Sequence, residues 1–535
     1  MEKPKVRISV RNLVEFILRS GDLDNSRGSS GDKEAMLKGG RLHRKIQRSM
    51  KGNYQAEVSL KRESEYEDVI IQVEGRADGI FTEDGEFWID EIKGTYGNLQ
   101  AMEVPVPVHR AQAMCYGWIY GEKEGLSQIG IQMTYSHLDT EDTRRFREIF
   151  SMEELKNWYQ KLLDDYHKWI SCSLSWKKER NASMKDLQFP FPYREGQREI
   201  VSGVYHTVSS KKTLFVQAPT GVGKTMSAIF PSVRAIGEGK GETLFYLTAK
   251  TITGTVAWEA FHTLRENGLK FKVTAITAKE KLCFLDSPEC TPEKCPYAKG
   301  HFDRVNDAVY ELWTTEEVYS REVIRAHAEK WQVCPFEMCL DLSIWVDGII
   351  CDYNYVFDPN VHLKRFFGEN ISGDYIFLID EAHNLVERGR EMYSAGISRQ
   401  SLVALRKKIR KRFSKLARTL DKANRQMMEL EENLAETGKG YQVLPNPGVL
   451  PITFLTISGE LEEILEEKEL EEELRREILE FYFIVRDFLN VSELVDENYV
   501  VYTENSAEEG FRLRLFCVNP AENLGEYLKK GKSAI

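Results

Sequence analysis

The chain has 535 residues, of which 42% are hydrophobic and 29% charged, and its formal net charge is −11. This is the composition of a globular protein with several domains, so wholesale disorder and fibrous repeats are excluded. No stretch approaches the roughly 18 consecutive apolar residues of a membrane span, and the first residues lack a signal-peptide core. We therefore expect a cytoplasmic protein without a membrane partner, in which any nucleic-acid site is a local basic surface.

The stretch 69–93 is typical of a β-hairpin, because two apolar strands flank turn-forming residues at 83–86. Asp78 lies late in the first strand. Glu91 and Lys93 are two residues apart on the second, so their side chains leave the same face. Two carboxylates and an ammonium group gathered in this way can bind Mg²⁺ or Mn²⁺, generate hydroxide and stabilise a phosphorane-like transition state.

Residues 40–120 resemble the RecB-like branch of PD-(D/E)xK nucleases, which carry a helical His, an Asp, a Glu-x-Lys and a later Gln-x-x-x-Tyr in that order. The resemblance implies a nuclease domain over residues 1–180 with Lys93 as a catalytic residue. Its implied metal ligands are His43, Asp78, Glu91 and the Ile92 carbonyl, and its implied substrate-positioning residues are Gln112 and Tyr116. Asp90 is an alternative carboxylate. A degenerate, non-cutting domain of this fold and an unrelated hairpin domain are the alternatives to a nuclease.

A phosphate-binding loop follows an apolar strand expected at 214–217 and precedes a helical pattern. Glycines in such a loop let backbone N–H groups surround a phosphate. Lys224 would reach the β- and γ-phosphate oxygens, and the Thr225 hydroxyl would bind Mg²⁺. The loop residues expected to contact ATP are Thr220, Gly221, Val222, Gly223, Lys224 and Thr225.

A second apolar strand ends in Asp380-Glu381-Ala382-His383. Asp380 would hold Mg²⁺, partly through water, and Glu381 would polarise the attacking water. With the phosphate loop upstream, the sequence resembles DEAH-type superfamily 2 helicases. The resemblance implies that Gln197 reads adenine, although a plain helix start there is the alternative. It also implies two contacts to the DNA backbone, Thr248 and Lys250, with a plain strand end as their alternative.

Between the two ATP motifs lies a cysteine-bearing insertion at 281–345. Four thiolates can hold a [4Fe–4S] cluster or a tetrahedral Zn²⁺ ion, and the cysteine spacing alone does not choose between them. The position of the insertion and the Pro-aromatic pair after Cys334 resemble the iron–sulfur helicases of the XPD/DinG family, which implies the cluster. Cys339 is an alternative to Cys334. The implied cluster ligands are Cys283, Cys290, Cys295 and Cys334.

Residues 386–510 are helical in pattern and strongly charged, with a basic run at 401–425 and an acidic run at 460–480. Complementary charge predicts two antiparallel helices, and a basic helix that grips DNA is the alternative. The apolar positions expected to mark their buried face are Leu461, Ile464, Leu465 and Ile478. The family resemblance makes this region a helical arch that encloses single-stranded DNA together with the cluster domain.

The predicted fold is multidomain α/β, with a RecA-like motor domain assembled from residues 190–280, 346–385 and 511–535. No second RecA-like domain is found after the DEAH motif, so we expect a truncated chain or a motor whose second half is separate. The predicted function is an ATP-dependent DNA helicase with a metal-dependent nuclease, acting on single-stranded or branched DNA in repair or defence. The alternatives are a helicase whose N-terminal domain only grips DNA, and a non-catalytic ATP- and DNA-binding module.

Overall fold

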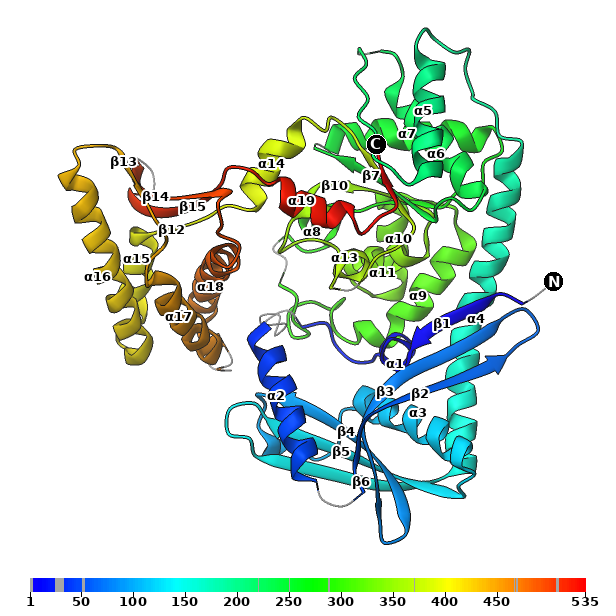
Figure 1. The fold of residues 1–535 in the computed structure, drawn as a ribbon, viewed down its shortest axis with the longest axis horizontal. Coiled ribbons are helices and arrows are strands. Elements are labelled where there is room, and N and C mark those ends of the chain that lie inside the picture. Colours follow the sequence, from blue (N-terminus) through cyan, green and yellow to red (C-terminus); the bar gives the residue numbers. More distant parts are fainter. Residues whose placement is uncertain are drawn as a thin grey trace.

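The computed structural model describes residues 3–24, 33–50, 53–219, 221–249, 251–286, 289–369, 371–465, 467, 470–506 and 510–535. These residues form three sheets, each with its own helices (Figure 1). Within the same residues, no helix is long and apolar enough to cross a membrane.

The first sheet, in the N-terminal domain, has the strand order β1-β3-β4-β5-β6, with β2 paired to β3. Its strands are β1 (Lys5–Ser9), β2 (Gln55–Glu65), β3 (Ile70–Glu83), β4 (Glu86–Thr95), β5 (Gln128–His137) and β6 (Thr143–Ser151). The expected hairpin is confirmed, because β3 and β4 pair antiparallel with Glu83 opposite Glu86. At its tip Asp84 and Gly85 have φ angles of 53° and 86°, the left-handed conformation that tight hairpin turns require.

Helices cover this sheet from two sides. Three of them share a large apolar core with the strands, namely α1 (Val10–Ile17), α3 (Pro107–Glu124) and α4 (Met152–Lys185). A fourth, α2 (Lys33–Ser49), packs Leu42 and Ile46 against Ile92. Because side chains alternate along a strand, β4 presents Ile92 to α2 and Ile89 to the large core.

The second sheet is parallel throughout, in the order β16-β11-β7-β10-β8-β9. Its strands are β7 (Thr243–Thr248), β8 (Val273–Ala275), β9 (Val318–Tyr319), β10 (Gly348–Asp352), β11 (Tyr375–Ile379) and β16 (Ser533–Ala534). One face is covered by α5 (Gln197–Ser210), α6 (Lys224–Gly237) and α7 (Thr251–Glu266). The other face packs against the cysteine insertion. Its helices are α8 (Lys279–Leu282), α9 (His301–Thr315), α10 (Arg321–Trp331) and α11 (Pro335–Leu342).

The strand expected at 214–217, before the phosphate loop, is wrong for the described structure. Only Thr213 forms a bridge, to Ala534, and Phe215 is 87% exposed. The neighbour at this edge is β16, which is two residues long, so the segment has too little partner backbone to form a ladder.

The third sheet has the order β12-β15-β14-β13 and is antiparallel. Its strands are β12 (Ala395–Ser398), β13 (Tyr441–Leu444), β14 (Tyr499–Ser506) and β15 (Gly510–Cys517), and its helices are α15 (Arg399–Ile409), α16 (Ser414–Glu436), α17 (Leu450–Leu465) and α18 (Glu472–Ser492). This arch region extends away from the rest of the chain, with α14 (Asn384–Met392) and α19 (Ala521–Leu528) at its base (Figure 1). The expected boundary at 510/511 is wrong, because β15 pairs with β12 and β14.

The expected charge pairing between the basic and acidic runs is confirmed, but each run is divided between two helices and does not form a single one. Arg412 forms an ion pair with Glu467 at 3.0 Å, and Lys415 forms one with Glu463 at 3.1 Å. The four apolar positions expected to mark the buried face all lie in the core of the arch region.

The 34-residue helix α4 connects the N-terminal domain to the second sheet, which lies in the region predicted to be the motor domain. Its Trp169 stacks on Trp313 of the insertion. Further along, Arg180 forms an ion pair with Asp347 at 2.7 Å, and both side chains are only 5% exposed. The Trp176 indole also donates to Asp347, at 2.9 Å. The N-terminal domain is therefore held to the motor by a continuous helix anchored in both cores.

Candidate functional site

The N-terminal domain brings the six nuclease-like side chains expected from the sequence into one neighbourhood. Lys93 Nζ lies 2.8 Å from Glu91 Oε1 and donates to Gln112 Oε1 at 3.2 Å. Gln112 and Tyr116 lie one turn apart on α3, and Gln112 hydrogen-bonds the Tyr116 hydroxyl.

Asp78 and His43 complete this group from the side of α2. Asp78 Oδ2 accepts a hydrogen bond from the Ile92 N–H at 2.7 Å, which fixes the carboxylate beside β4. Its other oxygen, Oδ1, lies 3.7 Å from His43 Nδ1. Strands β3 and β4 thus supply the carboxylates and Lys93, while α2 and α3 supply the flanking polar groups.

Glu91 is the most informative member of the site. It is 1% exposed, and its Oε2 has no hydrogen-bond partner among the described residues. Burial, reinforced by the Asp78 charge and opposed by Lys93, raises the pKa of Glu91 to about 8. A buried carboxylate oxygen without a donor is costly, and a cation would satisfy it. The donor set of one imidazole and two carboxylates fits a divalent cation such as Mn²⁺.

As the side chains stand, no group of three or more His, Cys, Asp or Glu residues in the described part of the chain is arranged to hold a metal ion. The carboxylates and the imidazole therefore have to draw closer to coordinate a cation. That requirement concerns side-chain rotamers, because the strands and helices already bring the residues together.

Asp90, the alternative carboxylate, belongs to a different network. It is fully buried and accepts hydrogen bonds from Thr134 at 2.6 Å, Gln132 at 3.0 Å and Tyr54 at 3.1 Å. Burial raises the pKa of Asp90, against these donors. Its hydrogen-bonding capacity is used within the fold, which favours Glu91 as the ligand.

Gly75 is a site residue that motif reading missed. A Cβ at Gly75 would lie 2.6 Å from the Tyr116 hydroxyl oxygen, so the glycine leaves the space into which Tyr116 projects. A glycine inside a strand is a known signal of such close approach.

In the motor domain the phosphate loop lies against the DEAH segment. Gly221 and Gly223 have φ angles of 83° and 82°, a conformation that glycine adopts without strain. Lys224 begins α6, and its Nζ lies 3.2 Å from the Ala218 carbonyl and 3.9 Å from Glu381 Oε1.

The two residues expected to bind Mg²⁺ are linked by Tyr246, which sequence reasoning did not single out. Its hydroxyl donates to the Asp380 carboxylate and lies 3.4 Å from Thr225 Oγ1. Burial and the charge of Glu381 raise the pKa of Asp380, while Tyr246 and Lys224 oppose that rise. Tyr246 occupies an interior strand position, where the sequence gives no signal beyond a core aromatic.

The remaining residues expected to contact ATP or DNA differ in their surroundings. Gln197 is buried, and its amide accepts from the Arg194 N–H at 3.0 Å and donates to the Val222 carbonyl at 2.9 Å. It therefore supports the phosphate loop directly. Thr248 is buried at the end of β7. Thr220 and Lys250 lie outside the described residues.

Among the described residues, no three of the four expected cluster cysteines are arranged to hold a metal ion. Cys295 and Cys334 are buried in one small apolar cluster. Lys279 interacts with the thiols of Cys290 and Cys334, which raises the pKa of Lys279 despite its burial. Cys283 directly follows α8.

Cys339, the alternative ligand, points elsewhere. It is fully buried, and its Sγ contacts Thr274 Oγ1 at 3.7 Å and the Ala275 carbonyl at 3.9 Å, both on β8. Cys334, by contrast, shares its cluster with Cys295. The arrangement therefore favours Cys334 over Cys339.

Comparisons with known proteins find similarity in a part of the chain that includes the DEAH segment. Residues 264–402 match the family model DEAD_2. The Fanconi anemia group J protein homolog of Gallus gallus is 26% identical over 180 residues, covering 30% of this chain and 14% of that protein. The XPD helicase subunit of the general transcription and DNA repair factor IIH of Arabidopsis thaliana is 22% identical, covering 50% of this chain and 40% of that protein.

A probable ATP-dependent helicase of Methanocaldococcus jannaschii is 40% identical over 204 residues, covering 37% of this chain and 29% of that protein. A solved XPD helicase is 18% identical, with coverages of 64% and 57% and a TM-score of 0.39. The chain thus spans less than half the length of these curated relatives. The sequence matches thus show that part of this chain is similar to helicases of the XPD type.

Proposed function

We propose that this chain is the ATP-binding part of an iron–sulfur DNA helicase of the XPD/DinG type, joined to an N-terminal metal-dependent nuclease. The helicase assignment is carried by the contact between the phosphate loop and the DEAH segment, where Lys224 Nζ lies 3.9 Å from Glu381 Oε1. Lys224 neutralises phosphate charge, and Glu381 orients the attacking water. A second RecA-like unit supplies the arginine that completes hydrolysis in this class of motor.

The nuclease assignment is carried by the unpartnered oxygen of Glu91 within the group formed by His43, Asp78 and Lys93. His43, Asp78 and Glu91 would hold one divalent cation, which supplies activation of water and stabilisation of charge at the scissile phosphate. Lys93 Nζ stabilises negative charge at the same place, and Gln112 holds the Lys93 ammonium in position. Tyr116 borders the site on α3.

The test of the nuclease is cleavage of end-labelled single-stranded DNA by the full chain with Mn²⁺. We expect cutting by the wild type and loss of cutting in Asp78→Ala and in Glu91→Ala. Asp84→Asn is the matched control, because Asp84 is an exposed carboxylate at the tip of the same hairpin. Folded wild-type protein that binds DNA without cutting it would favour the second candidate, a DNA-gripping domain.

For the cysteine insertion we propose a [4Fe–4S] cluster held by Cys283, Cys290, Cys295 and Cys334. The proposal is supported by the small cluster that Cys295 and Cys334 share and by the interaction of Lys279 with Cys290 and Cys334. Iron, zinc and acid-labile sulfide are measured on protein purified without oxygen. About four irons per chain are expected for the wild type and for Cys339→Ser, with loss of iron in Cys334→Ser. Stoichiometric zinc without iron would contradict the cluster.

A further inference from the structure

Four of the ten Lys and Arg residues in the basic run at 401–425 are paired with carboxylates, which lowers the charge that this run can offer to DNA. Lys408 pairs with Glu477, Arg412 with Glu467 and Lys415 with Glu463. Arg406 is likewise paired with Asp421, at 2.8 Å. Other surfaces of the arch region are therefore candidates for contact with DNA.

The outer face of the third sheet is such a surface. Along β15, Leu513 and Leu515 enter the core, so Arg512 and Arg514 project from the opposite face. The register sets Arg514 between Gly396 and Tyr502, and Arg512 between Ser398 and Glu504. On the outermost strand, Tyr441 is opposite Glu504 and Val443 is opposite Tyr502. Tyr441 and Val443 are 60% and 59% exposed.

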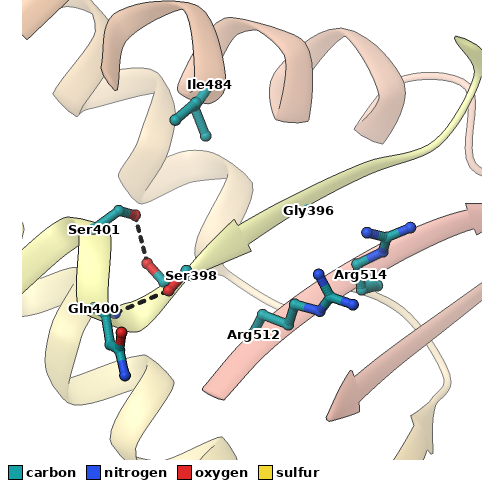
Figure 2. Close-up of a pocket in the computed structure, with 7 residues that line it drawn as sticks. All are labelled: Gly396, Ser398, Gln400, Ser401, Ile484, Arg512 and Arg514. Carbon is teal, nitrogen blue, oxygen red and sulfur yellow. Dashed lines mark hydrogen bonds between the residues drawn. The ribbon is translucent and has the colours of Figure 1, made fainter. Parts of the chain in front are cut away.

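At the β12 edge this face deepens into a cavity of about 450 Å³. Figure 2 shows Arg512 and Arg514 side by side on β15, across from the start of α15 and Ile484 of α18. Ser398, Gln400 and Ser401 add polar groups to the lining. The cavity is therefore a basic and polar recess at one end of a sheet face that also carries Tyr441, Val443, Tyr502 and Glu504.

The charge in the recess is unevenly balanced. Arg512 donates to Glu504 at 2.6 Å, so much of its charge is compensated. Arg514 forms no ion pair with any described residue, and its buried Nε has no hydrogen-bond partner among them. Gly396 makes room for it, because a Cβ there would lie 2.7 Å from Arg514 Cδ. An unpaired guanidinium with a buried, unsatisfied N–H favours an anion with several oxygen atoms.

We infer that this sheet face is a platform for single-stranded DNA, with a backbone phosphate at Arg514 and bases stacked on Tyr441 and Tyr502. Proteins that bind single strands combine positive charge with exposed aromatic rings in this way. The inference rests on the proposed function and specifies where the arch region touches its substrate. It assigns that contact to the sheet and leaves the basic helix α16 without a DNA-binding role.

The test is fluorescence anisotropy of labelled oligo(dT) with the full chain in the absence of nucleotide. We expect at least about tenfold weaker binding by Arg514→Glu, and about five- to tenfold weaker binding by Tyr441→Ala. Arg514→Ala should reduce the slope of log affinity against log salt by about 0.7, the value for one lost phosphate contact on a single strand. Arg418→Glu, an exposed arginine of α16, is the matched control and should bind like the wild type.

Thermal melting of each variant verifies that the fold is retained, and Tyr441 is exposed enough that its truncation should not disturb the core. Wild-type-like binding by Arg514→Glu and Tyr441→Ala would overturn the platform and leave the proposed function intact. A wild-type chain that binds no single-stranded DNA would overturn the platform and count against the proposed helicase as well.

Discussion

The N-terminal site has its carboxylates on strands β3 and β4, whereas the ATP site has them in the turn after β11, and the two sites differ in how far the chain encloses them. The Glu91 side chain is 2% exposed and Lys93 is 24% exposed, whereas Glu381 and Lys224 are 41% and 36% exposed. The N-terminal site takes its groups from one sheet and two helices that surround them. The ATP site lies beyond the carboxyl end of β11, and its Lys224 and Glu381 side chains remain accessible to a substrate.

The first prediction concerns a substitution in the ATP site, which should leave the N-terminal site unchanged. Lys224→Ala should weaken ATP binding by at least about tenfold, because it removes a charged partner of the phosphates. Cleavage of single-stranded DNA should be unchanged, since the two sites share no residue. Nucleotide-binding and nuclease assays on the same preparation measure both activities, with Lys212→Ala, an exposed lysine nearby, as control. Parallel loss of both activities would show that the sites depend on each other.

The second prediction concerns the joint between the two regions. Arg180→Ala leaves Asp347 buried without its cation and should lower the free energy of unfolding by about 3–5 kcal/mol. Lys177 lies on the same helix as Arg180 and forms an exposed ion pair with Glu242. Lys177→Ala should lower the free energy of unfolding by at most about 1 kcal/mol. Denaturant unfolding compares the two variants. Equal effects would mean that the buried pair adds nothing specific to the joint.

The third prediction concerns the packing of Tyr116 against Gly75 in the N-terminal site. Gly75→Ala places a methyl group where the Tyr116 hydroxyl lies, so we expect about a tenfold loss of DNA cleavage through displacement of that side chain. Tyr116→Ala removes the hydroxyl and the ring carbons that the added methyl group would meet. The double variant Gly75→Ala/Tyr116→Ala should therefore cleave no worse than Tyr116→Ala alone. An additional loss in the double variant would show that Gly75 has another role.

The smallest expected effect is a pH dependence at the base of the arch region. Burial, with a contribution from Asp358, raises the pKa of Asp487 to about 6, although Asn360 donates to it. An unfolded Asp titrates near pH 4, so ionising Asp487 destabilises the fold as the pH rises from about 4 to about 6. Asp487→Asn should therefore gain melting temperature over the wild type across this range and keep the gain at pH 7. A constant difference would contradict the raised pKa.

The sequence predicted what short motifs and local patterns encode. The hairpin at 83–86, the buried face of the acidic helix and the charge pairing in the arch region all follow from local spacing. Alternation along β4 separated Asp90 from Glu91, yet it could not say which face would meet α3. The three-dimensional packing resolves that choice, because Asp90 is satisfied by Thr134 and Gln132.

What the sequence did not predict depends on partners that are distant along the chain. The third sheet joins β12 at 395–398 to β15 at 510–517, and a four-residue strand carries little pattern of its own. The segment at 214–217 has the composition of a strand, but its described neighbour is too short to pair with it. In both places strand formation depends on available partner backbone as well as on hydrophobicity.

The continuous helix α4 has a consequence for the products of the proposed reactions. At about 1.5 Å per residue, its 34 residues form a rod about 51 Å long, anchored in the N-terminal core by Leu162 and in the motor core by Met184. A strand drawn through the motor would meet the cutting site at a constant separation. The rod would then act as a molecular ruler, and fragment lengths would cluster around a value set by the protein and independent of DNA sequence.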